Sequence, residues 1–221
     1  MTTFVLVPGM CHGGWCFDDL AADLRAASYD VRALTLTSVG DPGTPPDPAV
    51  DLETHVADVV RALDASRGPV VLAGHSYGGL PMTVAADRRP ARVDALVYLD
   101  AFVPRDGESA RTMTNDAERA WYDEGRATGL VPRLPFFDAR ASDHPLATLE
   151  QPARLEHGLE RFRRRVYLYA QRWGGMTSPF APTLARLHGD PRWTVHELDA
   201  AHNLMRDVPD RLRDILLDAA R

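Results

Sequence analysis

Residues 70–79 read Val-Val-Leu-Ala-Gly-His-Ser-Tyr-Gly-Gly, and this stretch decides the fold. A short β-branched, apolar run ends in Gly-x-Ser-x-Gly, and a helix-competent segment follows. This order of strand, turn and helix is the setting of a nucleophile elbow, a strained turn that aims the serine hydroxyl out of the sheet. Cβ atoms at Gly74 and Gly78 would collide with the neighbouring strand and helix. The preceding strand and the second glycine at 79 favour this interpretation over a chance match in a loop, so Ser76 is the predicted nucleophile.

Segments of strand character alternate with segments of helical periodicity on both sides of this stretch. Strands are predicted over residues 2–7, 30–36, 70–74, 94–99, 166–170 and 193–198. Helices are predicted over residues 15–27, 52–63, 80–87, 178–188 and 209–220. Strands that alternate with helices form doubly wound parallel sheets. The sequence therefore predicts an α/β fold with a mostly parallel, six-stranded sheet.

Residues 105–163 have a different character, being charged, proline-bearing and irregular. We interpret them as a helical cap inserted into a core of residues 1–104 and 164–221, all within a single domain. Their aromatic residues Trp121, Phe136 and Phe137 form either an apolar acyl or aryl pocket or the cap's own core. A loop rich in proline, glycine and aspartate, residues 38–50, is expected at the rim of the site.

Composition narrows the class of partner. The net charge of −6 over 221 residues offers a nucleic-acid backbone no electrostatic attraction. All 25 basic side chains are arginine, which excludes catalysis by a lysine Schiff base. No apolar stretch approaches the length of a membrane span, and the N-terminal residues read as a strand rather than a signal peptide. We expect a cytoplasmic protein with a small-molecule substrate. Its oligomeric state stays open, and a homodimer is one alternative.

The two cysteines, Cys11 and Cys16, lie close together near the start of the chain. Such a pair is no disulfide framework, and it fits a reducing compartment. His12 lies beside them, but no second Cys/His pair has the spacing of metal ligands. We therefore expect reduced, packed cysteines, no metal site and no organic cofactor.

A serine hydroxyl needs a base to take its proton, and that base is usually a histidine held by a carboxylate. His202 follows the last predicted strand and precedes the last helix. In hydrolases with a nucleophile elbow the histidine comes from that loop, in the chain order serine, acid, histidine. The oxyanion hole needs two backbone N–H groups. Tyr77 supplies one at the start of a helix, and Met10, in the turn after the first strand, is the best candidate for the other.

The glycine-rich turn after the first strand also carries candidates for contact with substrate, namely Gly9, His12 and Trp15. For His12, and for His75 beside the nucleophile, a packing or hydrogen-bonding role is favoured, because His202 already occupies the place of the base. Trp15 is interpreted as core or as the floor of the pocket.

Together these motifs resemble the plant methylesterase and hydroxynitrile lyase family and its bacterial relatives, within the α/β hydrolases. Residues 5–16, 74–79, 97–104, 106–109, 144–148 and 151–152 carry the resemblance. It implies an α/β hydrolase fold with esterase or lyase activity. The lyases of this family place a threonine at the position of Gly9 and a lysine at that of Asn203, so the chain sides with the hydrolases. Pro8 departs from the pattern, which has a histidine before that glycine.

By this resemblance, the chain has no acid at the position where the family has its triad aspartate. The family's triad aspartate follows the fifth strand, where this chain has Trp173 and no carboxylate nearby. In one alternative the acid has moved to Asp100, at the end of the strand beside the elbow strand and facing the same crevice. In a second, Asp199 supplies the carboxylate, although a residue three before the histidine can point away. In a third there is no acid. We favour Asp100.

The sequence thus predicts a serine carboxylesterase for small apolar or aromatic esters, with Ser76, His202 and Asp100 as its triad. Two other classes of function stay open. One is a metabolite-tailoring enzyme that cleaves a thioester, lactone or carbon–carbon bond, or that acts as a lyase or cyclase. The other is a ligand-binding homologue without catalysis, which the absence of an acid would favour.

Overall fold

The computed structural model describes residues 2–221, and Met1 lies outside the described residues. Its main sheet has six strands in the order β2-β1-β3-β4-β7-β8, with every neighbouring pair parallel. The strands are β1 Thr3–Val7, β2 Asp30–Ala33, β3 Val70–His75, β4 Val93–Leu99, β7 Arg164–Arg172 and β8 Thr194–Ala201. The prediction of a doubly wound parallel α/β sheet is confirmed.

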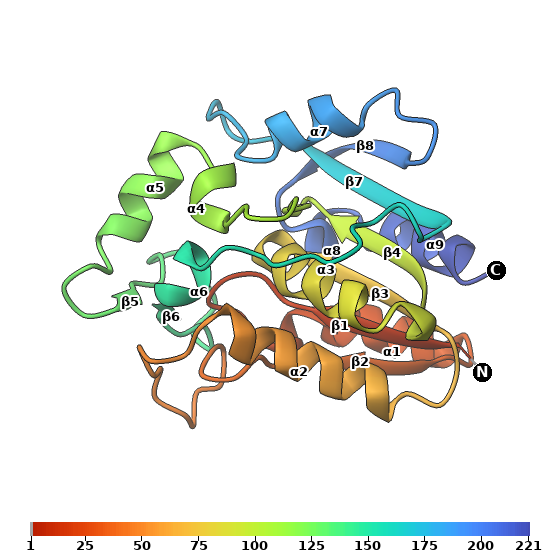
Figure 1. The fold of residues 1–221 in the computed structure, drawn as a ribbon, viewed down its shortest axis with the longest axis horizontal. Helices are drawn as coiled ribbons and strands as arrows, with labels where there is room; N and C mark the ends of the chain where they lie inside the picture. Colours follow the sequence, from red (N-terminus) through yellow and green to blue (C-terminus); the bar gives the residue numbers. More distant parts are fainter. Residues whose placement is uncertain (1) are drawn as a thin grey trace.

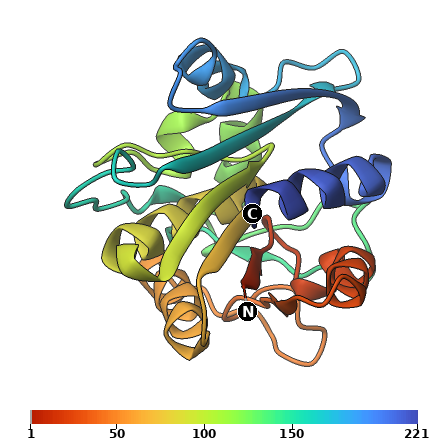
Figure 2. The same ribbon diagram turned by 90° about the vertical axis from the view of Figure 1, so that its right-hand side faces the viewer.

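Helices cover both faces of this sheet (Figure 1). They are α1 Asp18–Ala26, α2 Leu52–Ala65, α3 Gly79–Arg88, α4 Ala110–Met113, α5 Asp116–Asp123, α6 Ala147–Glu150, α7 Ala181–Leu187, α8 Leu204–Asp207 and α9 Pro209–Ala219. Figure 2 shows α1 and α9 on one side of the sheet and α2 and α3 on the other. Parallel strands need such crossover connections, and placing them on both faces buries the central strands β1 and β3 throughout.

Each face of the sheet has its own apolar core, and β3 shows how the sequence divides between them. Val70 and Leu72 pack on the face that carries α2 and α3. Val71 and Ala73 point to the opposite face, toward α1 and α9. Because side chains alternate along a strand, a strand covered on both faces needs an uninterrupted apolar run. Every residue of β3 is accordingly buried.

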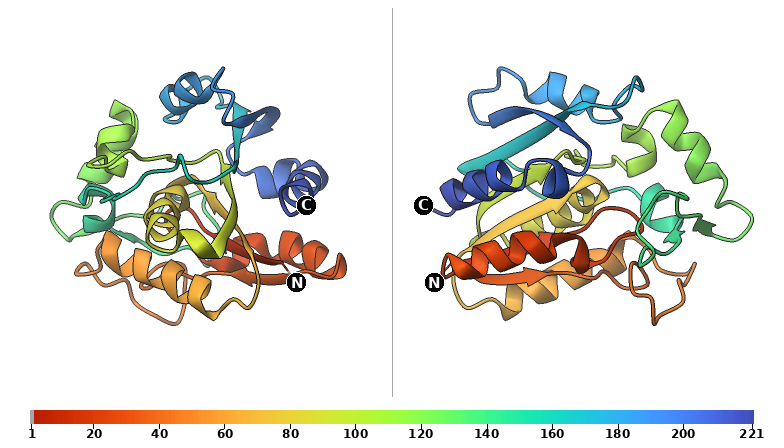
Figure 3. Two further views of the ribbon diagram at one scale, coloured as in Figure 1. Left: turned by 45° about the vertical axis from the view of Figure 1, so that its right-hand side comes forward. Right: turned by 180° about the vertical axis from the view of Figure 1, so that it is seen from behind.

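The chain between β4 and β7 forms α4, α5, α6 and an antiparallel ribbon of β5 Leu130–Val131 and β6 His144–Pro145. The prediction of a helical cap is therefore incomplete, because two short strands pair within the segment. This segment lies at the end of the molecule opposite the two termini (Figures 1 and 3). That end carries the carboxyl ends of the parallel strands, since β1 starts beside the N-terminus.

Two element boundaries differ from the predicted ones, and both differences bear on the site. Strand β2 ends at Ala33 rather than at residue 36, and Thr35 turns away to accept the Gly14 N–H at 3.0 Å. Strand β8 continues to Ala201, beyond the predicted end at residue 198. Asp199 is therefore a strand residue, and the short helix α8 lies between β8 and α9.

The glycines of the elbow lie where no side chain fits. A Cβ on Gly74 would be 2.5 Å from the Met82 sulfur on α3. A Cβ on Gly78 would be 2.5 Å from the carbonyl oxygen of Val7 on β1. These close approaches let the turn after β3 fit between a strand and a helix.

Within residues 2–221, no helix is long and apolar enough to cross a membrane. Cys11 and Cys16 are free thiols. Burial raises the pKa of both thiols above their ordinary values, which keeps them protonated and of low reactivity.

Replacing Gly78 by alanine is expected to destabilise the fold by about 1–3 kcal/mol, the usual range for overpacking, because the added methyl group meets backbone that cannot rotate away. The free energy of unfolding in urea measures this. Gly43→Ala is the matched control, since a Cβ there has its nearest neighbour at 3.5 Å and the residue does not have a positive φ. Equal stability of the two variants would contradict the prediction.

Candidate active site

Ser76 follows the last residue of β3 and has a left-handed backbone, with φ of 54°. It opens a 3-10 turn, Ser76–Gly78, that runs into α3. A non-glycine residue in this region is strained and needs support from its surroundings. The Phe102 N–H donates to the Ser76 carbonyl at 3.1 Å and ties the turn to the chain after β4. Gly9 packs on the other side, where a Cβ would be 3.0 Å from the Ser76 Cβ.

Asp100 occupies the corresponding place on the neighbouring strand. The register of β3 and β4 pairs His75 with Leu99, so Ser76 and Asp100 are the next residue on each strand. Asp100 also has a left-handed backbone, with φ of 45°, and its side chain is fully buried. Two strained polar residues therefore stand side by side at the carboxyl end of the sheet.

His202 follows β8 directly, and its ring reaches Asp100. The His202 Nδ1–H donates to Asp100 Oδ2 at 2.7 Å. The Ala170 N–H donates to the other carboxylate oxygen at 3.2 Å. Burial raises the pKa of the Asp100 carboxyl, and the Ala170 N–H opposes that rise. With Nδ1 protonated and bound, the Nε2 atom of His202 is left as the free base.

Asp199 does not take part in this arrangement. Its side chain is 86% exposed and pairs with Arg172 at 3.2 Å. The alternation of side chains along β8 accounts for this, because Leu198 and Ala200 face the core.

Trp173 stands where the family resemblance places the acid, and it packs against His202 instead. The centroids of the two rings are 4.9 Å apart. Phe180 stacks on His202 from a second direction, with centroids 5.4 Å apart and an interplanar angle of 17°. These rings displace part of the water around the imidazole, which disfavours its charged form, and this partial burial lowers the pKa of His202 below its ordinary value of 6.5. The ring is therefore neutral, as a general base must be.

Of the two predicted oxyanion donors, Tyr77 directly follows Ser76, and Met10 follows Gly9, the residue that packs on Ser76. Tyr77 is in the first helical turn, where N–H groups have no acceptor within the helix. Met10 lies in the turn after β1, and within residues 2–221 its N–H donates to no other backbone group. The arrangement thus leaves backbone donors available beside Ser76.

His75 and His12 make hydrogen bonds to backbone, as the sequence suggested. The His75 Nε2–H donates to the His202 carbonyl at 3.0 Å, and the two rings lie 4.5 Å apart. This contact places the base beside the residue that precedes Ser76. The His12 Nδ1–H donates to the Met10 carbonyl at 2.6 Å and so braces the turn that carries one oxyanion donor.

The predicted aromatic lining divides into packed and exposed residues. The ring centroid of Phe137 lies 4.9 Å from that of His12 and 6.1 Å from that of Trp121. These contacts link the inserted segment to the turn after β1. Trp15 lies 5.2 Å from His12, donates to the Gly40 carbonyl at 2.8 Å and is covered by the guanidinium of Arg140. Phe136 is 80% exposed and packs on Phe137 alone among the aromatic rings described. Phe136 is therefore not part of the core of the inserted segment, because its ring points to solvent.

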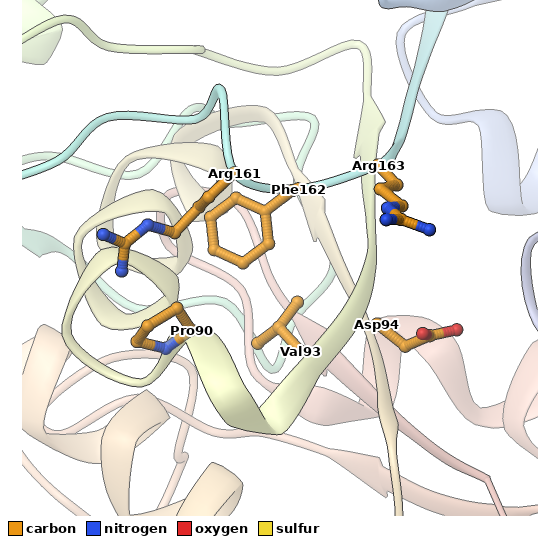
Figure 4. Close-up of a pocket in the computed structure, with 6 residues that line it drawn as sticks. All are labelled: Pro90, Val93, Asp94, Arg161, Phe162 and Arg163. Carbon is orange, nitrogen blue, oxygen red and sulfur yellow. The ribbon is translucent and has the colours of Figure 1, made fainter.

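Two surface pockets lie apart from this arrangement. The one in Figure 4 is lined by Val93, at the start of β4, with Phe162, Arg161, Arg163, Pro90 and Asp94, and so lies at the opposite end of that strand from Asp100. The other lies between residues 41–46 and residues 133–143. Across residues 2–221 no cluster of three His, Cys, Asp or Glu side chains could hold a metal ion.

The sequence did not single out three buried residues around this site. Phe180 packs on His202, as described above. His144, on β6, accepts the Cys11 N–H at 3.2 Å, and His55, on α2, contacts the Tyr77 hydroxyl at 2.8 Å. A polar residue within an apolar stripe was the available signal for His55, since it follows the buried Leu52 at helical spacing.

The chain is similar to known proteins over its whole length. The alpha/beta hydrolase family matches residues 4–220. The carbendazim hydrolyzing esterase of Nocardioides sp. (strain SG-4G) is 35% identical, and the match covers 98% of each chain. Methylesterase 7 of Arabidopsis thaliana is 36% identical over 46% of this chain and 40% of its own length, so the chain spans less than half of that plant relative.

Solved structures show the same fold. An extracellular alpha/beta-hydrolase from a Paenibacillus species superposes with a TM-score of 0.78 at 21% identity, covering 99% of both chains. A pyrethroid hydrolase from Sphingobium faniae JZ-2 gives a TM-score of 0.78 at 22% identity, covering 99% of this chain and 97% of its own. At these identities the likeness establishes the fold alone.

Replacing Trp173 by alanine is expected to raise the pKa of His202, because water then reaches the imidazole and stabilises its charged form. NMR titration of ring-labelled histidine measures the shift. Trp193→Ala is the control, since Trp193 is a half-buried indole that packs on Tyr98 and Arg165. A His202 pKa that stays the same in both variants would show that Trp173 does not set it.

Proposed function

The chain belongs to the α/β hydrolase family, and from that membership we propose a carboxylesterase with Ser76 as nucleophile, His202 as base and Asp100 as acid. The resemblance to methylesterases and their bacterial relatives is confirmed at the level of the family. The hydrogen bond of 2.7 Å between His202 and the buried Asp100 carries the assignment of roles. It gives the base a fixed tautomer in a chain that lacks a carboxylate at the family's usual position.

We propose the following mechanism for these residues. The His202 Nε2 takes the proton of Ser76 Oγ as that oxygen attacks the acyl carbonyl carbon. The oxyanion that forms accepts hydrogen bonds from the N–H groups of Met10 and Tyr77. His202 then donates its proton to the leaving alcohol. In the second half a water, deprotonated by His202, attacks the acyl-enzyme, and the acid departs as Ser76 regains its proton.

The substrate we propose is a small ester with an apolar or aromatic part. The aromatic link of His12, Phe137 and Trp121 supports this, because flat apolar rings favour contact with other rings. The relatives fit the same class, since one hydrolyses carbendazim and another is named a methylesterase. Aryl and methyl esters, with an aryl carbamate beside them, are the first compounds to test.

We propose that residues 105–163 act as the cap that selects this substrate, with residues 38–50 at the rim. The two segments contact each other, since the Gly40 N–H donates to the Ser142 hydroxyl at 2.8 Å. We also propose a cytoplasmic location, which the free thiols of Cys11 and Cys16 support.

A fluorophosphonate probe is expected to label the wild-type protein at Ser76, because an activated serine beside a neutral histidine attacks phosphorus readily. Mass spectrometry of the digested protein locates the adduct. Ser76→Ala should remove both the label and the turnover of an aryl ester. Ser109→Ala is the control, since Ser109 is a buried serine that caps α4. Labelling that persists in Ser76→Ala would place the nucleophile elsewhere.

Asp100→Asn is expected to lower the turnover number for an activated aryl ester by about 10⁴, because an amide holds the imidazole in the wrong tautomer. Asp199→Asn, which alters an exposed carboxylate, should leave turnover within about twofold of wild type. Steady-state kinetics of both variants decide the assignment. A large loss in Asp199→Asn with none in Asp100→Asn would reverse it.

A further inference from the structure

Three buried rings, those of His55, Tyr77 and His144, pack against one another beneath the nucleophile turn. The centroid of Tyr77 lies 4.8 Å from that of His144 and 5.7 Å from that of His55, and both pairs are edge-on. The two histidine rings are 5.8 Å apart. The three side chains are inaccessible to solvent. They come from the nucleophile turn, from α2 and from β6, so this cluster joins three parts of the chain that are distant in sequence.

The hydrogen-bond partners of His144 determine which of its two ring nitrogens carries the proton. A backbone N–H can only donate, so the Cys11 N–H at 3.2 Å requires a bare lone pair on His144 Nδ1. The proton of the neutral ring is then on Nε2, which donates to Thr148 Oγ1 at 2.9 Å. The Thr148 hydroxyl donates in turn to the Pro145 carbonyl at 2.8 Å. Every polar atom of His144 is satisfied in one arrangement only.

The hydrogen-bond partners of His55 determine its tautomer in the same way. Its Nε2 faces the Thr37 carbonyl at 2.9 Å and must carry the proton, because a carbonyl oxygen can only accept. Its Nδ1 is therefore bare and accepts the Tyr77 hydroxyl proton at 2.8 Å. Burial lowers the pKa of both histidines, which keeps them neutral and agrees with these assignments.

The cluster includes the side chain of one proposed oxyanion donor, Tyr77, and is hydrogen-bonded to the residue that follows the other, Met10. Tyr77 carries one of the two donor N–H groups on its own backbone. Cys11, the residue after Met10, has a left-handed backbone with φ of 66° and is held at both polar atoms by the inserted segment. Its N–H donates to His144, and its carbonyl accepts the Ser142 N–H at 3.0 Å. The His144 ring thus touches one donor residue and holds the neighbour of the other.

We propose that His144 is a positioning residue for the oxyanion hole, which sets the Met10 N–H and the Tyr77 N–H at a fixed mutual geometry. The inference rests on the proposed function, because it needs those two groups to bind the oxyanion. It assigns to the segment between β4 and β7 a part in catalysis as well as in substrate choice. His144 itself does not touch the reacting atoms.

The test compares His144→Phe with His144→Asn. Phenylalanine keeps a ring against Tyr77 but offers no acceptor to the Cys11 N–H. Asparagine restores an acceptor, because its Oδ1 can occupy the place of Nδ1. We expect His144→Phe to lower kcat by about 10- to 100-fold with KM within about twofold, and His144→Asn to recover most of the loss. His188→Phe, at an exposed histidine, is the control for the chemical change.

Two further readouts separate positioning from general damage. Titration with a fluorophosphonate normalises kcat to the number of intact sites. The inhibition constant of phenylboronic acid, which forms a tetrahedral adduct on Ser76, should rise by the factor by which kcat/KM falls. The midpoint of the acid limb of the pH profile should not move, since the pair of Asp100 and His202 is untouched.

The variants distinguish failure of this inference from failure of the proposed function. A His144→Phe variant with wild-type kcat, or one that changes KM alone, overturns the inference. If His144→Phe does not fold, His144→Leu replaces it, because leucine likewise offers no acceptor to the Cys11 N–H, and an unchanged kcat in that variant overturns the inference as well. A wild-type protein with no Ser76-dependent turnover would instead refute the proposed function, so the two failures are distinguishable.

Discussion

The carboxylate of Asp100 is buried completely between β4 and β7, and the candidate site is arranged around it. An isolated buried charge is unstable, so it persists only where hydrogen bonds replace water. The Ala170 N–H on β7 and the ring of His202, which follows β8, supply those bonds. The left-handed backbone of Asp100 is a second unfavourable feature, and the bond from its own N–H to the Leu168 carbonyl, at 2.7 Å, helps to hold it.

Asp100, the proposed acid, directly follows β4, whereas the family pattern has the acid after β7. In the family pattern the carboxylate stands near Trp173, and here an indole fills that place. With Phe180 it covers two sides of the His202 ring, whose side chain remains 33% exposed. The acid and the apolar wall therefore depend on each other. A carboxylate on β4 leaves room for the aromatic rings, and the rings keep the histidine neutral while the buried carboxylate orients it.

The sequence predicted the sheet well because each central strand carries its own evidence of burial on both faces. Ser76 was predictable because the elbow is local, with all its steric demands inside ten residues. The proximity of Asp100 and His202 was predictable only as one of three alternatives, since it depends on which strands are neighbours. The contacts of Phe180 and His144 were not predictable, because their partners are far away in sequence. The family resemblance marks residues 144–148 but assigns His144 no partner. The exposure of Phe136 was not predictable, because an aromatic residue in an irregular segment looks the same whether it is buried or not.

The inserted segment is bound to the catalytic core through polar contacts as well as through apolar packing. The Ser142 hydroxyl accepts the Gly40 N–H at 2.8 Å, and the Ser142 N–H binds the Cys11 carbonyl, so one residue fastens both the rim loop and the turn after β1. His144 adds the bond to the Cys11 N–H, across 133 positions of sequence. Buried backbone groups left without such partners would be unfavourable, which couples the segment to the shape of the site. Under the proposed roles, a change of substrate preference made within this segment leaves the oxyanion hole undisturbed only where Ser142 and His144 keep their partners.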